Sequence, residues 1–435
     1  MAAPWADEAA ARLADRAGEA VVVRVAADAS RAELAAGVGT HLAEEGVRGV
    51  VSLLAAAPVE GPGRLVTPVL HLLQGLGDAG CEAPLWCLTS GAVATGDAGE
   101  RPVDPVQAGV WGFGRTAALE LPGRWGGLLD LPEAPDEAAW DQVCRALTDS
   151  AEDQLAVRPD GTHVRRLVPL PATGPAAPGP RAGGTVLITG GTGALGSRLA
   201  RRQAEAGAAH LVLASRAGGS APGAAALGEE LRAVGCRVTF AACDVGDREA
   251  LAALLAAHPV DAVLHAAGTA HLTPLDRLTA AELDGVLRAK ADAALHLDAL
   301  LGDRPLDAFV LFSSIAGVWG SGEQAGYAAA NAVLDAVAES RRARGLTATS
   351  VAWGPWAEAG MAVDGGVEDH LRKRGLRTLR PAWAVRSLER EIADGRAATV
   401  VADVDWRLFH PSFTALRPSP LLDTVPAVEE LRATA

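Results

Sequence analysis

Short apolar runs alternate with longer amphipathic stretches along the second half of the chain. Such alternation predicts a doubly wound parallel sheet with helices on both faces, because strands covered on both sides are apolar throughout. Helical spacing is clearest at Ala194–Glu205, Leu278–Leu301 and Ala325–Arg342. The predicted strands are Thr185–Thr189, His210–Ala214, Arg237–Ala242, Ala262–His265, Ala308–Phe312, Ala348–Ala352 and Ala398–Val401.

The first half repeats this rhythm more weakly. Strands are predicted at Ala20–Val25, Val47–Ala55, Leu85–Leu88, Gly127–Leu131 and Gln154–Val157, and helices at Arg31–Glu44, Leu65–Gly75, Val103–Leu119 and Glu137–Thr148. The predicted fold class is therefore α/β, with two tandem Rossmann-like doubly wound parallel sheets. Only the second contains a phosphate-binding turn in the right context, so the first is expected to be degenerate and structural.

A stretch rich in proline and glycine separates the two halves. Residues Pro169–Gly184 include five prolines and four glycines, a composition that cannot form a helix or a central strand. We therefore predict a structural subdomain over residues 1–183 and a catalytic, nucleotide-binding subdomain over residues 184–435.

Composition and charge narrow the classes of function. Hydrophobic residues make up 49%, and the net charge of −14 argues against a nucleic-acid or anionic-membrane surface. The five cysteines lack metal-site spacing and suggest thiols in a reducing compartment. The N-terminus has no signal-peptide pattern, and no apolar run reaches membrane-spanning length. The expectation is a cytoplasmic protein without a metal site.

Two segments match the dinucleotide-binding pattern G-x-G-x-x-G. Gly75–Gly80 follows a helical run and leads toward a strand, so we interpret it as a helix C-cap and loop. Gly191–Gly196 follows a strand and opens a helix, the context in which backbone N–H groups meet a pyrophosphate. The predicted cofactor loop consists of Gly190, Gly191, Thr192, Gly193, Ala194, Leu195 and Gly196.

The ends of the next strands predict which nucleotide binds. Ser215 and Arg216 occupy the place where an NAD site has an acidic residue. A guanidinium there suits a 2′-phosphate, which favours NADPH, although a solvated surface arginine is the alternative. Further cofactor contacts are predicted at Asp244, Val245, Ala266, Ala267 and Gly268.

Rare residues indicate the catalytic chemistry. The chain has one tyrosine, Tyr327, one asparagine, Asn331, and two lysines, one of them Lys290. Tyr327 and Asn331 are four residues apart and therefore share a helix face. Ser314 ends the preceding strand, where doubly wound folds bind ligands. Read singly, these residues could be a strand-end cap, a turn residue or a solvated lysine.

At these positions the sequence resembles the short-chain dehydrogenase/reductase superfamily. It is most similar to the ketoreductase domain of modular type I polyketide synthases, over almost the whole chain. The resemblance rests on V-W-G-F-G-R-T-A-A-L-E (110–120), H-A-A-G, F-S-S-I-A-G, Y-A-A-A-N and W-G-P-W. Most of the superfamily has Y-x-x-x-K, whereas here Asn331 replaces that lysine and Lys290 lies on the preceding helix, as in polyketide ketoreductases.

The resemblance implies NADPH-dependent reduction of a β-ketoacyl thioester carried by an acyl carrier protein, beside other polyketide synthase domains. Ser314 and Tyr327 would hydrogen-bond the carbonyl oxygen, and Tyr327 would donate the proton. Lys290 and the oxidised nicotinamide would lower the pKa of Tyr327. Asn331 would hold a water or the lysine for proton resupply.

Stereochemical motifs of the family imply the A1 type. An L-D-D motif is absent, since its positions read Ala270-His271-Leu272, and Trp319 lies eight residues before Tyr327. The resemblance therefore implies an L-configured β-hydroxyl. Gln324 replaces the histidine that marks an epimerised α-carbon, so an unepimerised α-carbon is implied. Trp356 and Met361 are expected on the same substrate side, although Trp319 could instead only pack its loop.

A lid is expected around residues 356–380. Its glycines supply hinge freedom, and Arg372, Lys373, Arg374 and Arg377 form a basic cluster. The cluster could meet an acidic carrier protein, but a solvated helix face is the preferred interpretation. Two other functions stay open: a redox-silent module that binds NADP or epimerises its substrate, and a purely structural docking module.

Overall fold

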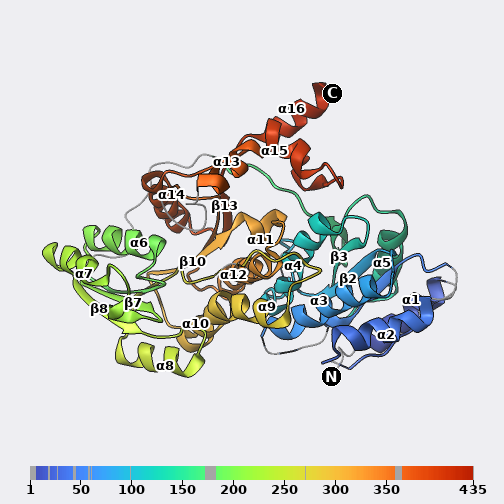
Figure 1. Cartoon of the computed structure of the whole chain (residues 1–435), viewed down its shortest axis with the longest axis horizontal. Coiled ribbons are helices and arrows are strands. Elements are labelled where there is room, and N and C mark those ends of the chain that lie inside the picture. Colours follow the sequence, from blue (N-terminus) through green and yellow to red (C-terminus); the bar gives the residue numbers. More distant parts are fainter. Residues whose placement is uncertain are drawn as a thin grey trace.

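The computed structural model describes residues 6–17, 20–26, 28–42, 46–56, 59, 61–97, 99–171, 183–269, 271–357 and 365–434. Two α/β lobes lie side by side (Figure 1), with the N-terminal lobe on the right and the C-terminal lobe on the left. The C-terminal lobe contains the predicted catalytic residues and is called the catalytic lobe below. No helix in this part of the chain is both long enough and apolar enough to cross a bilayer. Met361 and residues 358–364 of the expected lid lie outside the described residues.

The catalytic lobe contains a seven-stranded parallel sheet in the order β13-β11-β10-β9-β6-β7-β8. Its strands are β6 (Thr185–Thr189), β7 (His210–Ser215), β8 (Arg237–Ala242), β9 (Ala262–His265), β10 (Ala308–Ser314), β11 (Thr349–Trp353) and β13 (Ala398–Val401). All seven predicted strands are confirmed. The chain runs outward from β6 to β8 and then returns to β9, so the order reverses between β6 and β9. Ligands bind at such a switch point.

Helices cover both faces of this sheet. They are α6 (Ala194–Glu205), α7 (Ala224–Ala233), α8 (Arg248–Ala257), α9 (Ala280–Leu287), α10 (Ala293–Leu301), α11 (Ile315–Trp319), α12 (Ala325–Ala343) and α14 (Pro381–Asp394), with the 3₁₀ turn η2 (Gly218–Ser220). The single helix predicted over Leu278–Leu301 is wrong in detail. It begins at Ala280 and is interrupted by a π-helical turn, η3 (Arg288–Asp292). Such turns often occur at functional sites.

The N-terminal lobe has a five-stranded sheet in the order β1-β2-β3-β4-β5. Its strands are β1 (Val50–Ser52), β2 (Leu85–Ser90), β3 (Trp125–Leu131), β4 (Gln154–Arg158) and β5 (Gly161–Val164). Its helices are α1 (Ala6–Ala17), α2 (Arg31–Leu42), α3 (Gly63–Asp78), α4 (Pro105–Glu120) and α5 (Glu137–Asp149), with the 3₁₀ turn η1 (Leu54–Ala56). The first four strands are parallel, and β5 adds an antiparallel edge.

Three predictions for this lobe were wrong in whole or in part: the strand at Ala20–Val25, the length of the strand at Val47–Ala55, and the helix C-cap and loop at Gly75–Gly80. Ala20–Val25 is not a strand: it pairs with no neighbour among the described residues, and Val21 is 57% exposed, so its β-branched residues reflect propensity without a partner. The strand predicted over Val47–Ala55 shortens to β1. Helix α3 continues through Gly75 and Gly77 to Asp78, and Gly80, with φ of 72°, ends it, as the Cys81 N–H donates to the Leu76 carbonyl (2.8 Å).

The C-terminal segment crosses both lobes. It comprises α13 (Gly365–Lys373), the short antiparallel pair β12 (Leu376–Arg377) and β14 (Asp403–Val404), α15 (Trp406–Phe413), η4 (Pro420–Leu422) and α16 (Pro426–Thr434). Beyond α15, the Arg417 guanidinium binds the carbonyls of Pro122, Trp125 and Gly126 and pairs with Asp153 at 3.4 Å. The end of the chain is thereby attached to the N-terminal lobe.

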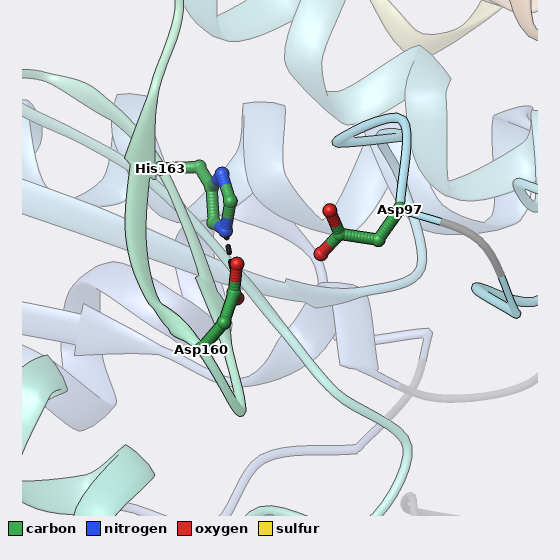
Figure 2. Close-up of side chains that lie close together, drawn as sticks. All are labelled: Asp97, Asp160 and His163. Carbon is green, nitrogen blue, oxygen red and sulfur yellow. Dashed lines mark hydrogen bonds and ion pairs between the residues drawn. The ribbon is translucent and has the colours of Figure 1, made fainter.

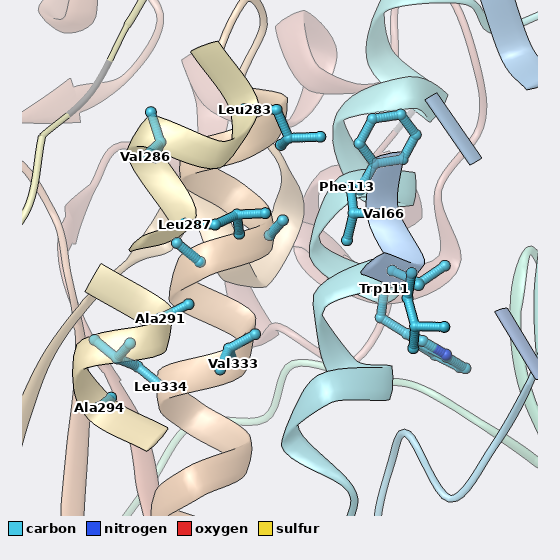
Figure 3. Close-up of a cluster of buried hydrophobic side chains, with 14 of the residues drawn as sticks. Val66, Trp111, Phe113, Leu283, Val286, Leu287, Ala291, Ala294, Val333 and Leu334 are labelled. Carbon is cyan, nitrogen blue, oxygen red and sulfur yellow. The ribbon is translucent and has the colours of Figure 1, made fainter. Parts of the chain in front are cut away.

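One hydrophobic core spans both lobes. It joins Val66, Trp111 and Phe113 of α3 and α4 to buried residues of α9 and α12 (Figure 3). Helices α4 and α12 approach so closely that a Cβ on Gly112 would lie 2.7 Å from the Ala329 Cα and closer still to the Ala328 carbonyl. Only glycine fits there, so the glycines and alanines of these two helices permit backbone-to-backbone packing.

Gly112→Val should therefore destabilise both lobes together. The added side chain would meet backbone, which cannot rotate away, so we expect a loss of about 3 kcal/mol or more in unfolding free energy. Chemical denaturation followed by fluorescence measures this. Gly123→Val, at a site with open space around its Cβ, is the control. Equal stability of the two variants would contradict the close-approach argument.

Candidate active site

A cleft of about 2080 Å³ lies at the carboxyl ends of the catalytic strands. Its walls come from the ends of β6 to β11, from α4 of the N-terminal lobe and from His370, Leu371 and Arg374, which lie within the segment predicted as a lid. Nearly all the described residues predicted for cofactor, catalysis and substrate line this cleft. The exceptions are Gly191 and Asn331, which lie directly behind its wall.

The glycine turn between β6 and α6 fits a pyrophosphate. Gly190 has φ of 66°, and a Cβ there would lie 3.0 Å from the Ala267 amide nitrogen. A Cβ on Gly196 would overlap the Gly190 carbonyl oxygen. Gly193 is the N-cap of α6 and has no side chain that could cap the helix. The N–H groups of the first turn at the cleft therefore have no side-chain acceptor from the N-cap residue. This combination favours an anion at the helix N-terminus.

The Arg216 side chain is exposed and is available to bind an anion. It is exposed at the cleft, after the end of β7, and among the described residues no hydrogen bond or ion pair involves its guanidinium. Asp244 differs, because its carboxylate pairs with Arg288 (3.1 Å) and accepts the Gly246 N–H (3.1 Å). The sequence did not indicate this pairing of Asp244. The uncommitted guanidinium beside Ser215 matches a 2′-phosphate.

Tyr327, Ser314 and Lys290 converge on one part of the cleft. The Lys290 Nζ lies 5.2 Å from the centroid of the Tyr327 ring and donates to the Phe312 carbonyl (2.8 Å). Ser314 ends β10, and its hydroxyl also accepts the Ala316 N–H (3.2 Å), so the strand-end cap and the cleft position coexist. Lys290 is only 5% exposed, which rules out a solvated helix lysine.

Burial dominates the titration of the two key groups. Burial raises the pKa of Tyr327 above its ordinary value, while the side chains of Ser314 and Asn331 act in the opposite direction. In the protein without a nicotinamide, the pKa of Tyr327 is therefore raised, whereas the resemblance implies a lowered pKa when the cofactor is bound. Burial lowers the pKa of Lys290 to about 8, although the Asp335 carboxylate favours its charged form.

His265 connects the lysine to the sheet. Its Nε2 lies 2.9 Å from the Lys290 carbonyl and its Nδ1 lies 2.7 Å from the Thr189 hydroxyl. Because a carbonyl only accepts, Nε2 carries the proton and the Thr189 hydroxyl donates to Nδ1. Burial lowers the pKa of His265 to about 4, so the ring is neutral. The sequence analysis did not predict that His265 contacts the backbone of Lys290. The available signal was a polar residue at the end of an apolar strand.

Asn331 lies one helical turn beyond Tyr327. It is fully buried, and its Nδ2 donates to the Tyr327 carbonyl (2.7 Å). Its Oδ1 has no hydrogen-bond partner among the described residues. A buried acceptor without a partner is costly, so this oxygen suits a water or an ammonium donor.

The part of the cleft that contains the predicted substrate residues is aromatic. Trp319 is 4% exposed and packs on Phe409, with ring centroids 5.3 Å apart. Trp356 stacks edge-on against Trp353 at 5.1 Å, and Gln324 begins α12 without capping it. Trp319 thus packs against α15, and it also lines the cleft.

A second polar cluster lies away from the cleft, on the N-terminal lobe. Asp97, Asp160 and His163 have ligand atoms within 4.8 Å of one another (Figure 2). His163 already bonds Asp160 at 2.8 Å, and both aspartates are exposed. Nothing else described at this place points to a bound ion, so we assign it no role.

Comparisons with known proteins agree with this geometry. A family model for the KR domain matches residues 184–358, and a model for the Rossmann fold domain of the polyketide synthase extender module SpnB matches residues 3–167. The structure of an A1-type ketoreductase is 49% identical, with a TM-score of 0.89 over 99% of this chain and 92% of that chain. This chain belongs to the ketoreductase family of modular polyketide synthases. It is therefore an oxidoreductase that uses a nicotinamide cofactor.

Curated relatives are much longer than this ketoreductase. Polyketide synthase GfsA of Streptomyces halstedii is 50% identical over 95% of this chain, which spans only 6% of GfsA. Pikromycin polyketide synthase component PikAIII of Streptomyces venezuelae is 48% identical over 95% of the chain, which spans 26% of PikAIII. A C2-type ketoreductase structure also matches, at 44% identity and a TM-score of 0.89 over 98% of this chain and 95% of that chain. Overall similarity therefore does not distinguish the types.

The buried lysine predicts a pH profile. With a pKa of about 8, the Lys290 ammonium is present below that pH and is lost above it. We expect kcat/KM to fall as pH rises through this value, because kcat/KM reports groups of the free enzyme. Steady-state kinetics across pH would show this, and Lys290→Met should give a lower and flatter profile. A wild-type profile that stays level well above this pH would contradict it.

Proposed function

We propose that this ketoreductase uses NADPH to reduce the β-keto group of an acyl thioester held on an acyl carrier protein. The product is an L-β-hydroxyacyl thioester with an unepimerised α-carbon. The observation that carries the proposal is the convergence of Tyr327, Ser314 and Lys290 beside the glycine turn. Neighbouring polyketide synthase domains are the expected partners, in line with the multidomain relatives.

The reaction needs a hydride and a proton. The nicotinamide, when bound, supplies the hydride to the β-carbon. The Ser314 and Tyr327 hydroxyls donate hydrogen bonds to the carbonyl oxygen as negative charge develops on it, and Tyr327 then transfers its proton. The Lys290 ammonium stabilises the resulting phenolate. The Asn331 Oδ1, which has no hydrogen-bond partner among the described residues, would hold the water that returns a proton to the site.

Binding residues divide by their chemistry. The glycine turn, residues 190–196, would hold the pyrophosphate, and Arg216 with Ser215 would hold the 2′-phosphate. Val245 and residues 266–268 line the cleft, where they would pack against the adenosine and nicotinamide portions of the cofactor. Trp319, Trp356 and Gln324 shape the substrate side, where a buried indole selects the thioester's approach by shape.

The alternatives make different predictions. A redox-silent module would bind NADPH without oxidising it, and a structural module would bind no nucleotide. Neither uses the phenol, the hydroxyl and the buried lysine that meet in the cleft. Reduction is therefore the function that the site supports best.

Tyr327→Phe tests the proton donor. We expect turnover of a β-ketoacyl thioester to fall by about 10²–10⁴-fold while NADPH affinity stays nearly unchanged, because only the hydroxyl is lost. Nicotinamide absorbance measures turnover, and protein fluorescence measures binding. Undiminished turnover would remove Tyr327 from its role.

Arg216→Ala tests the cofactor. Losing a charge-assisted contact of about 1.5–3 kcal/mol should weaken NADPH binding by roughly 10–100-fold. NADH binding should change little, because NADH lacks the 2′-phosphate. Arg304→Ala removes the same charge from an exposed position before the amino end of β10, whereas the cleft lies at the carboxyl ends of the strands, and it serves as the control. Equal losses for NADPH and NADH would refute the assignment.

A further inference from the structure

Two loops of the catalytic lobe form the substrate wall of the cleft. One follows β9 and includes Leu272 and Pro274, and the other, residues 320–324, joins α11 to α12 and leads to Tyr327. Both loops are held from outside their own lobe. The side chain that joins them is Glu120, the last residue of α4 in the N-terminal lobe.

The Glu120 carboxylate accepts one backbone hydrogen bond from each loop. Oε2 accepts the Leu275 N–H at 2.8 Å, and Oε1 accepts the Glu323 N–H at 2.7 Å. These donors are 155 and 203 residues from Glu120 in sequence. A carboxylate offers a separate acceptor oxygen to each of these donors, whereas an amide or a hydroxyl side chain has a single acceptor oxygen.

The two loops also bond each other at the same place. The Thr273 N–H donates to the Glu323 carbonyl at 2.8 Å, so both backbone groups of Glu323 are fixed. Glu323 has φ of 63° and is the only non-glycine residue with positive φ in the described part of the chain. Such a conformation persists only where its surroundings impose it. The next residue, Gln324, begins the helix that carries Tyr327.

Neighbouring residues of the N-terminal lobe hold the flanks of these loops. Arg115 binds the Gly317 carbonyl, and Arg165 binds the Val318 carbonyl at 2.6 Å, on the N-terminal side of Trp319. Gln74 donates to the carbonyls of Leu275 and Leu278 at 2.7 and 2.8 Å. The backbone on both sides of the substrate wall is therefore fixed by side chains from the other lobe.

Glu120 does not act as an ordinary salt bridge. No ion pair involves it among the described residues, and it is half-buried. Burial raises the pKa of its carboxyl group, the two backbone N–H groups lower it, and the carboxylates of Glu323 and Asp276 raise it further. The two backbone N–H donors, and not a cation, satisfy this half-buried carboxylate.

We propose that Glu120 is a positioning residue for stereoselectivity: it clips the 272–276 loop to the 320–324 loop and so fixes the substrate wall beside Trp319. The inference rests on the proposed reduction and extends it to a residue of the lobe that binds no cofactor. When Glu120 is lost, the Thr273–Glu323 hydrogen bond still joins the two loops, but the Leu275 and Glu323 N–H groups lose their acceptor. The wall then loosens, and the ketone presents both faces to the hydride. Cofactor binding, on the opposite side of the cleft, is unaffected.

The test uses the whole chain, NADPH and racemic 2-methyl-3-oxopentanoyl N-acetylcysteamine thioester, with chiral chromatography of the four possible products. Glu120→Ala should raise the fraction of minor stereoisomers about tenfold and leave the NADPH dissociation constant within about twofold. Glu120→Gln retains one acceptor and should fall between Glu120→Ala and the wild type. It also keeps the test available if the alanine variant does not fold.

A matched control separates position from stability. Val66→Ala weakens the shared core near α4 without touching either loop, so it lowers Tm but should leave the product ratio unchanged. The proposal is overturned if Glu120→Ala and Glu120→Gln keep the wild-type ratio. It is also overturned if Val66→Ala shifts the ratio equally at the same loss of Tm. Failure of the wild type to oxidise NADPH would instead reject the proposed reduction itself.

Discussion

The close approach of α4 and α12 is the constraint on which the rest of the structure depends. Where Gly112 faces Ala328 and Ala329, no side chain separates the two backbones. The helix that carries Tyr327 and Asn331 is therefore packed directly against the other lobe. Because the contact leaves no room for adjustment, the position of α12 is set by the N-terminal lobe as well as by its own sheet.

The catalytic groups are then fixed by a chain of short contacts. Thr189 bonds His265, and His265 bonds the carbonyl of Lys290 within a π-helical turn. The lysine reaches across to the Phe312 carbonyl at the end of β10, beside Tyr327. Strand ends thus hold the lysine and a helix holds the phenol, and the cleft between them is where we propose that a ketone and a nicotinamide meet.

Sequence reasoning succeeded where the signal was local. The strands of the catalytic sheet, the turn at Gly190–Gly196 and the grouping of Ser314 with Tyr327 follow from apolar runs and from residues at short spacing. It failed where partners are distant in sequence. The valine-rich segment Ala20–Val25 pairs with no strand in the described part of the chain. Nothing near Glu120 in the sequence indicates that two loops distant in sequence bind it. Such pairings are set by the packing of the lobes, which periodicity does not encode.

The shared core has a consequence for how ketoreductases of this kind can be recombined. Since one apolar cluster joins α3 and α4 to α9 and α12, the two lobes should melt as one cooperative unit. The proline-rich stretch between them looks like a natural seam in the sequence, yet a chimera joined there would pair two surfaces that never evolved together. Exchange points outside the pair of lobes keep that surface, and the loops it holds, intact.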